Sequence, residues 1–296
     1  MSIIALFGPT GVGKTELAIA VADVLRERGE RPVAVSADAL QVYKGLEILT
    51  GAADAADQER LEHRMVSIVD VDQTFSVAQY AQLAHRAIDD IIDDGGRPIV
   101  VGGTGLYLRA ALADLDLKPP PEPGVRERLM EQLHQQGPER LHRQLAERAP
   151  AVAATIDPRD RHRIVRALEL DHAGALTEAP SDNRLWTTDT RRPTRLIALT
   201  MDRERLKERI DARVDAMVAA GAREQVLAAE RHGASPTARK AVGYQELLAG
   251  DVETMKLRTR QYARRQLTWL RKLPDVEHVD VTDRDPAGVA RDLLGR

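Results

Sequence analysis

The sequence predicts an α/β fold: a P-loop-type parallel sheet core flanked by helices, with a helical insertion domain. Over the first 114 residues, short β-rich runs alternate with helical periods, as they do in proteins with a parallel sheet. A glycine-rich turn separates the first of these runs from the first helical period. After a proline-rich stretch near residue 120, the strand signal disappears until residue 195.

The expected strands are short apolar runs bounded by turn residues. They are 3–7, 33–36, 65–69 and 98–101 in the N-terminal part, followed by 195–200 and 279–281. Helices are expected where apolar residues recur every three or four positions. They are 14–28, 77–93, 124–136, 139–148, 159–172, 203–232, 237–248 and 252–272, with a short helix at the end.

Residues 118–123 (KPPPEP) mark a domain boundary, because they can continue neither a helix nor a central strand. We therefore expect residues 118–192 to form the helical insertion domain. Residues 1–117 and 193–296 would form the P-loop catalytic core.

The composition limits the classes of site that the chain can build. It has no cysteine, which excludes disulfides, zinc-thiolate and iron-sulfur sites and thiol catalysis. The N-terminus lacks a basic leader and no apolar run is long enough to span a bilayer, so a cytoplasmic protein without membrane contact is expected. The net charge is −3, yet residues 239–272 carry nine basic and three acidic side chains, which predicts a local basic face.

A phosphate-binding loop is the most specific local signal. Residues 8–15 match the pattern G-x-x-x-x-G-K-[ST] between an expected strand and an expected helix. The loop amides would bind a diphosphate or nucleotide, Lys14 would add a charge, and the Thr15 hydroxyl would be the ligand of a Mg²⁺ cofactor. The predicted phosphate-binding residues are Gly8, Pro9, Thr10, Gly11, Val12, Gly13, Lys14 and Thr15.

A second glycine cluster, residues 102–105 (GGTG), follows the expected strand 98–101. Both clusters should emerge at the carboxyl edge of the sheet, where ligands of α/β proteins bind. Thr104 would then face the phosphates. Taken alone, the cluster is more simply a tight turn between a strand and a helix.

Six segments in collinear order resemble those of the tRNA dimethylallyltransferase (tRNA isopentenyltransferase) family. They are 36–46 (SADALQVYKGL), 101–108 (VGGTGLYL), 157–169 (DPRDRHRIVRALE), 213–217 (RVDAM), 241–244 (AVGY) and 259–269 (TRQYARRQLTW). Three positions depart from the family pattern: Ala39 stands where Ser is usual, residues 47–52 (EILTGA) replace D-I-G-T-A-K, and His162 replaces Gln.

The resemblance implies transfer of a dimethylallyl group from its diphosphate to N6 of the adenosine just 3′ of the tRNA anticodon. Asp38 would accept the proton of the amine, while Thr104 and Arg213 would help to stabilise the departing diphosphate. The simpler interpretation of Asp38 is a turn cap, and that of Arg213 is a solvated helix face.

The resemblance also implies contacts with the anticodon stem-loop of tRNA, made by a protein expected to be a monomer. They are assigned to Asp38, Ala39, Leu40, Gln41, Thr104, Arg126, His162, Arg163, Ile164, Val165, Arg166, Lys240, Ala241, Val242, Gly243, Tyr244 and Gln245. The aromatic residues Tyr244, Tyr262 and Trp269 could stack on bases or belong to the core, and His162 could be an ordinary surface histidine.

Three other functions share some of these features. A small-molecule kinase would have the same loop, but such an enzyme does not need a basic C-terminal helix. An isopentenyltransferase acting on free AMP or ADP would share the chemistry without needing a large nucleic-acid face. A non-catalytic RNA-binding module would not need Lys14 and Thr15.

Overall fold

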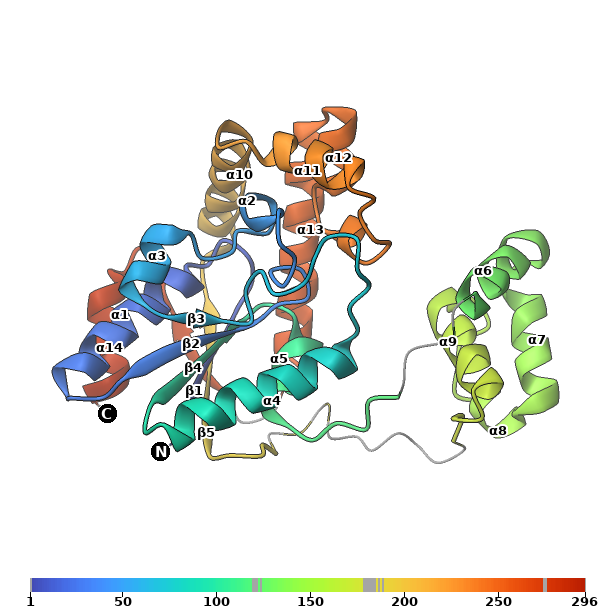
Figure 1. The fold of residues 1–296 in the computed structure, drawn as a ribbon, viewed down its shortest axis with the longest axis horizontal. Coiled ribbons are helices and arrows are strands. Elements are labelled where there is room, and N and C mark those ends of the chain that lie inside the picture. The colour runs from blue at the N-terminus through green and yellow to red at the C-terminus, as the bar shows by residue number, and fades with distance from the viewer. Residues whose placement is uncertain are drawn as a thin grey trace. The chain divides into compact units, whose positions relative to one another are not determined.

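The computed structural model describes residues 2–118, 122, 124–177, 185, 187, 189–273 and 276–295 (Figure 1). The chain divides into two compact units, which are considered separately. The first consists of Met1–Asp114 and Arg184–Arg296, and the second of Leu115–Asn183. The second unit begins beside the proline-rich boundary but returns to the first unit earlier than the predicted residue 192.

The first unit contains a six-stranded sheet in the order β3-β2-β4-β1-β5-β6. Its strands are β1 Ile3–Phe7, β2 Pro32–Ala37, β3 His63–Arg64, β4 Arg97–Gly102, β5 Thr194–Thr200 and β6 Glu277–Asp280. Every paired neighbour runs parallel. The predicted fold class, a P-loop-type parallel sheet flanked by helices, is therefore confirmed.

The strand register places three turns side by side at one edge of the sheet. Phe7 at the end of β1 is aligned with Gly102 at the end of β4, and Gly102 is aligned with Ala37 at the end of β2. The loops that follow these three strands therefore leave the sheet at the same level. This edge is where ligands of parallel sheets bind.

Helices of the first unit cover the sheet and extend beyond this edge (Figure 1). They are α1 Lys14–Glu27, α2 Glu47–Thr50, α3 Ala55–Arg60, α4 Val77–Asp93, α5 Gly105–Leu112, α10 Arg203–Ala219, α11 Ala222–Arg231, α12 Tyr244–Ala249, α13 Val252–Leu270 and α14 Pro286–Gly295. Leu17, Val21 and Leu25 of α1 share a buried core with Ile4 and Leu6 of β1. In the described part of the chain, no helix combines the length and apolar character needed to cross a bilayer.

The second unit is built from four helices in its described residues. They are α6 Val125–Gln136, α7 Pro138–Arg148, α8 Pro150–Ala153 and α9 Arg161–His172. Leu129 of α6, Leu141 and Leu145 of α7, and Ile164 and Leu168 of α9 form its own hydrophobic core. The helices of this unit agree with the missing strand signal in the insertion.

Three expected elements differ from the structure. The predicted strand 65–69 is wrong, because Met65 and Ser67 have positive φ angles of 64° and 49°, which break an extended run. The predicted helix 203–232 is two helices, separated at Gly221 with φ 100°. The predicted helix 237–248 is likewise interrupted, here at Gly243 with φ 95°.

Candidate active site

The phosphate loop adopts the backbone that its glycines predict. Gly11 and Gly13 have φ angles of 83° and 97°, a region that side chains other than glycine rarely occupy. Gly13 directly precedes α1, so the loop amides gather at the N-terminus of a fourteen-residue helix. Such a helix end is suited to an anion, because its first N–H groups have no partner within the helix.

Lys14 is partly buried within this loop. Its Nζ donates hydrogen bonds to the carbonyl oxygens of Gly8 at 3.0 Å and Pro9 at 2.9 Å. Burial, followed by the nearby charge of Arg213, lowers the pKa of Lys14 to about 8. A bound anion would stabilise the protonated form of this lysine and so raise its pKa.

Diphosphate binding is therefore expected to weaken as the pH rises above about 8. A bound anion raises the pKa of Lys14, so binding takes up a proton wherever the free lysine is neutral, and affinity falls by up to about tenfold per pH unit. Titration calorimetry of inorganic diphosphate from about pH 7 to about pH 9.5 measures this. Lys14→Met is the control and should remove the dependence; an equally steep decline in this variant would assign it to another group.

The second glycine turn lies beside the first. A Cβ at Gly102 would overlap the Ala37 carbonyl oxygen, so glycine is required where β4 passes β2. Thr104 is the residue before α5, and its Oγ1 is 2.9 Å from the Tyr262 hydroxyl. Thr104 therefore lies on the wall of the same cavity as the phosphate loop.

Asp38 follows directly on β2 and lines this cavity. Its Oδ1 accepts a hydrogen bond from the Leu40 N–H at 2.9 Å, so the carboxylate also stabilises the turn. The Asp38 carboxylate is within electrostatic range of both Lys14 and Arg213. The turn-cap interpretation is thus correct, and it leaves the carboxylate oriented toward two cations.

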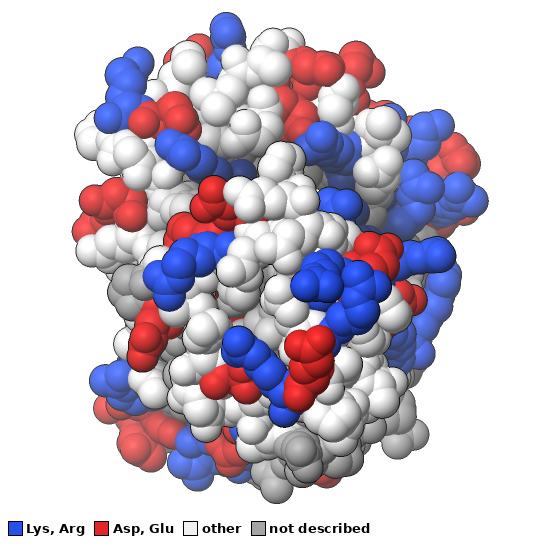
Figure 2. Space-filling view, turned by 90° about the vertical axis from the view of Figure 1, so that its right-hand side faces the viewer, with Lys and Arg blue, Asp and Glu red and all other residues white. Residues whose placement is uncertain are grey.

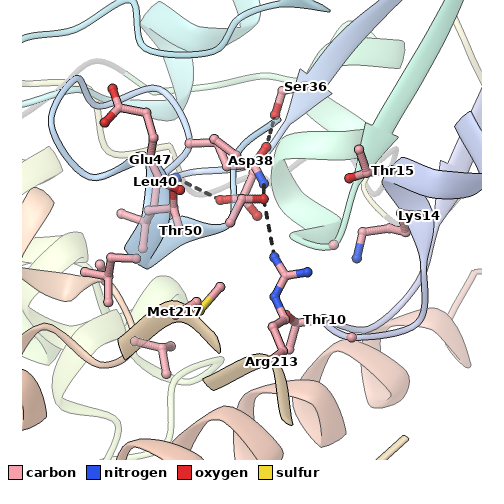
Figure 3. A pocket seen from close by; sticks show the side chains of 18 of the residues that line it. Thr10, Lys14, Thr15, Ser36, Asp38, Leu40, Glu47, Thr50, Arg213 and Met217 are labelled. Atoms are coloured by element: carbon pink, nitrogen blue, oxygen red, sulfur yellow. Dashed lines mark hydrogen bonds between the residues drawn. The ribbon is translucent and has the colours of Figure 1, made fainter. Parts of the chain in front are cut away.

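Arg213 reaches the cavity from α10 and points toward the Asp38 turn, with Lys14 and Thr15 on the phosphate-loop side (Figure 3). Its guanidinium donates to the Gly51 carbonyl oxygen at 3.3 Å. Burial lowers the pKa of this guanidinium, which means that the charge is held in a poorly solvated place. The interpretation of Arg213 as a solvated helix-face arginine is therefore wrong.

The loop 40–52, where the sequence departs from the family pattern, is held by side chains. Gln41 accepts from the Ser36 hydroxyl at 2.7 Å and donates to the Gly51 carbonyl at 3.2 Å. Glu47 accepts hydrogen bonds from the Gly45 N–H and the Ser67 hydroxyl, each within 3 Å. Sequence reasoning missed Glu47, and its position in the departing EILTGA segment was the available signal.

Gln225 holds the same loop from α11. Its Oε1 accepts from the N–H groups of Ile48 at 2.9 Å and Leu49 at 3.3 Å, and its Nε2 donates to Glu47 at 3.2 Å. These amides lie at the N-terminus of the short helix α2, which has no side-chain cap of its own. No sequence pattern pointed to Gln225, because its partners lie about 180 residues away.

These elements enclose one cavity of about 1120 Å³. Its polar end is formed by Thr10, Gly11, Gly13, Lys14, Thr15, Asp38, Thr104 and Arg213, and its apolar side chains include Leu49, Val214, Met217, Val242 and Met255. Val12 of the predicted phosphate-binding loop does not line the cavity. The cavity therefore combines an anion-binding loop, a carboxylate and an apolar wall. Ala39, Leu40 and Gln41 also line it, as do Lys240 and Ala241.

The residues predicted to contact RNA differ in their accessibility. In the insertion unit, the Arg163 side chain is 72% exposed, the Arg126 side chain is 41% exposed, and His162 is exposed. The side chains of Ile164, Val165 and Tyr244 are buried, at 0%, 1% and 0% exposure. These three side chains are therefore packed inside the protein and do not reach its surface.

Tyr244 has a structural partner that explains its burial. Its hydroxyl donates to Glu230 at 2.9 Å, and Arg239 binds the same carboxylate. In the segment that contains Tyr244, Gly243 and Ala241 are also buried, whereas Lys240 and Gln245 are exposed. In residues 240–245, only Lys240, Gln245 and the partly exposed Val242 therefore have side chains at the surface.

A buried carboxylate orients two arginines of the insertion unit. Glu169 on α9 has a fully buried side chain, and its oxygens lie 3.2 Å from Arg126 and 3.1 Å from Arg166. Arg166 also donates to the Lys118 carbonyl at 3.1 Å. The two guanidiniums are thus fixed on either side of one negative charge, a role that the sequence alone did not reveal.

The basic segment 239–272 is less positive than its composition predicts. Several of its basic side chains have acidic partners: Arg239 pairs with Glu230, Lys256 with Asp215 and Glu253, Arg258 with Glu246, and Arg260 with Asp211. Figure 2 shows the side of the protein that lies on the right in Figure 1, and basic and acidic side chains are interspersed on it. Arg264, Arg265, Arg271 and Lys272 remain exposed.

Comparisons with known proteins agree with this geometry. Residues 41–273 match the family model described as IPP transferase. The chain is 39% identical to a protein of Kineococcus radiotolerans named tRNA dimethylallyltransferase, over 99% of this chain and 95% of the relative. It is also 39% identical to a protein of Thermobifida fusca with the same name, over 96% and 92%.

A solved structure is similar over the whole chain as well. It is the full-length tRNA isopentenylpyrophosphate transferase of Bacillus halodurans, with 31% identity, a TM-score of 0.70, and coverage of 99% of this chain and 96% of that one. The family match and the curated relatives each span most of the sequence. The chain belongs to the IPP transferase family.

Proposed function

We propose that the protein transfers a dimethylallyl group from dimethylallyl diphosphate to N6 of the adenosine 3′-adjacent to the tRNA anticodon, releasing diphosphate. One observation carries this proposal: a single cavity joins the phosphate loop, the Asp38 carboxylate and an apolar wall. A diphosphate, a proton-bearing nucleophile and an isoprenoid chain need these three features together. The family relatives named tRNA dimethylallyltransferase support the same function.

The polar end of the cavity suits the leaving group. As the bond between the primary carbon and the diphosphate oxygen breaks, negative charge grows on the diphosphate. The loop amides, the Lys14 ammonium, the Arg213 guanidinium and the Thr104 hydroxyl all border this end. Charged and polar donors fixed in a buried site stabilise such a charge without having to reorganise.

Asp38 suits the nucleophile. The exocyclic amine of adenine is weakly nucleophilic and gains from a carboxylate that takes its proton as the new carbon–nitrogen bond forms. The hydrogen bond from the Leu40 N–H holds one carboxylate oxygen in place at the cavity wall. For this attack the adenosine would be turned out of the anticodon loop into the cavity.

The apolar side chains suit the isoprenoid tail. Leu49, Val214, Met217 and Met255 come from α2, α10 and α13 and line one cavity. Burial of a five-carbon chain against them would be worth about 0.8 kcal/mol per methylene-sized group.

Mg²⁺ is part of the proposal as the cofactor. No cluster of three or more His, Cys, Asp or Glu side chains able to hold a metal occurs among the residues that the structure describes. Mg²⁺ rarely needs one, because it keeps several waters and binds through few protein oxygens and the substrate phosphates. The Thr15 hydroxyl, on the cavity wall in the first turn of α1, fits this role. When bound, Mg²⁺ would neutralise part of the diphosphate charge.

Arginines of the insertion unit are proposed to bind tRNA phosphates. The double variant Arg126→Ala/Arg163→Ala is expected to weaken tRNA binding about tenfold or more at low salt. It should also reduce the slope of log affinity against log salt concentration by about 1 for each lost contact. Filter binding at several salt concentrations measures both quantities, and diphosphate affinity should stay unchanged.

Arg143→Ala is the matched control for this experiment, because Arg143 is an exposed arginine on α7 of the same unit. This variant should leave the slope of log affinity against log salt concentration nearly unchanged. An equal loss in the control would show that tRNA responds to the overall charge of the unit and not to Arg126 and Arg163.

The function is tested by offering the purified protein competing substrates. We expect label from dimethylallyl diphosphate to enter unmodified tRNA in the presence of Mg²⁺, with little transfer to free AMP or ADP and no hydrolysis of ATP. Transfer mainly to AMP or ADP would favour a nucleotide isopentenyltransferase. ATP hydrolysis with the label left in the donor would favour a small-molecule kinase.

A further inference from the structure

We propose that Gln266 and Tyr262 of α13 are positioning residues, which hold the phosphate loop and the second glycine turn in the arrangement that binds diphosphate. This inference rests on the proposed function, since it assigns the diphosphate to the same cavity. It concerns two side chains near the C-terminus that touch loops near the N-terminus.

Gln266 connects α13 to the phosphate loop directly. Its Oε1 accepts a hydrogen bond from the Thr10 N–H at 2.9 Å, across 256 positions of sequence. The Gln266 residue is only 5% exposed, so water does not readily replace it as the acceptor. The Thr10 N–H is half-buried with Gln266 as its acceptor, and a poorly hydrated N–H that loses its acceptor is costly. The loop conformation that directs the Thr10 N–H toward α13 therefore depends on Gln266.

The other end of the Gln266 amide packs against the second glycine turn. A Cβ at Gly103 would overlap the Nε2 atom of Gln266 and would lie 3.1 Å from the Gly8 carbonyl oxygen. The amide group thus fills the space between the two turns. Gly103 is required because it allows Gln266 to come this close.

Tyr262 lies four residues before Gln266 on α13, and it contacts the second glycine turn through Thr104. Its hydroxyl is 2.9 Å from Thr104 Oγ1, and it lies close to the Gln266 side chain. Burial raises the pKa of Tyr262, so its hydroxyl stays protonated and keeps its hydrogen-bonding capacity. Residues four positions apart share one helix face, which explains how the two side chains join.

Trp269 completes this contact on the same helix face. A Cβ at Gly105 would overlap the indole ring of Trp269, so the helix lies directly against the start of α5. Tyr262, Gln266 and Trp269 thereby fix Thr104, the two glycine turns and the phosphate loop to one rigid helix. We infer that these contacts set the spacing between Thr104 and the loop amides, which a diphosphate must bridge.

The inference is tested with Gln266→Leu, which keeps the approximate size of the side chain and removes its acceptor and donor. We expect the dissociation constant for inorganic diphosphate with Mg²⁺, measured by calorimetry, to rise about 10- to 100-fold. The KM for tRNA should change much less than the KM for dimethylallyl diphosphate. Gln261→Leu is the matched control, because Gln261 is exposed on the same helix, and it should bind diphosphate as the unchanged protein does.

Tyr262→Phe gives a second test that removes one oxygen atom and keeps the ring. It is expected to weaken diphosphate binding severalfold while the thermal midpoint stays near that of the unchanged protein. Diphosphate affinity within twofold of the unchanged protein in both variants would overturn the inference. Absence of diphosphate binding by the unchanged protein would instead overturn the proposed function, so the two failures can be told apart.

Discussion

Asp38→Asn is expected to lower kcat by about 10²- to 10⁴-fold, the usual contribution of a positioned general base. Asparagine keeps the size of the side chain and an oxygen that can accept the Leu40 N–H hydrogen bond, so the turn should survive. It cannot take the proton of the adenine amine. Affinity for tRNA and for diphosphate should change much less than kcat. Single-turnover transfer and equilibrium binding measure the two effects separately.

Asp70→Asn serves as the control for this substitution. Asp70 is an exposed carboxylate paired with Lys44 at 2.9 Å and is not part of the cavity wall. This variant should transfer at the normal rate. If Asp38→Asn also turned over normally, Asp38 would be a turn cap alone, and another group would have to receive the proton.

Lys14→Ala is expected to act on binding as well as on rate. It removes a partly buried charge whose Nζ lies 3.0 Å or less from two loop carbonyls, at the place proposed for the diphosphate. We expect diphosphate affinity and kcat each to fall by about 10²- to 10³-fold, comparable to the loss of one fixed donor at a developing anion. Calorimetry with inorganic diphosphate and single-turnover transfer measure the two losses.

Lys44→Ala is the matched control, since Lys44 is exposed and pairs with Asp70. It should bind diphosphate normally. A Lys14→Ala protein that kept full diphosphate affinity would place the diphosphate elsewhere in the cavity. The contrast with Asp38→Asn, which should spare diphosphate binding, separates the two roles.

The sequence predicted the positions of strands well where a strand is a continuous apolar run. Strands at 3–7, 33–36 and 98–101 are continuous apolar runs, as buried parallel strands are, and each lies within an observed strand. The stretch 65–69 has the same composition, but Met65 and Ser67 adopt left-handed backbone. No local pattern predicts this left-handed backbone, because it depends on hydrogen bonds between this segment and Val42 and its neighbours.

The break in the predicted helix 203–232 had a visible signal. Gly221 stands in the middle of an otherwise continuous helical pattern and adopts φ 100° between α10 and α11. Glycine adopts that conformation without steric cost and weakens a helix interior, so a glycine at this position favours the end of one helix and the start of another. Apolar residues recur at helical spacing both before and after Gly221, and this continuity led to the prediction of one helix.

The candidate site could be predicted only in part. The phosphate loop was predicted from its own residue pattern, whereas the roles of Asp38 and Thr104 were predicted from the resemblance of their segments to the family. Gln266 and Gln225 act through hydrogen bonds to backbone N–H groups far away in the sequence. A glutamine can make such a bond almost anywhere, so its presence in a sequence carries no information about its partner.

Nucleoside analysis of tRNA tests the central claim most directly. Unmodified tRNA is incubated with the protein, Mg²⁺ and dimethylallyl diphosphate, then digested and separated by liquid chromatography with mass detection. We predict a new adenosine derivative heavier by one dimethylallyl group in place of one hydrogen, mapped by partial digestion to the position just 3′ of the anticodon. Unmodified adenosine throughout the tRNA, under conditions in which the protein is folded and binds diphosphate, would contradict the account.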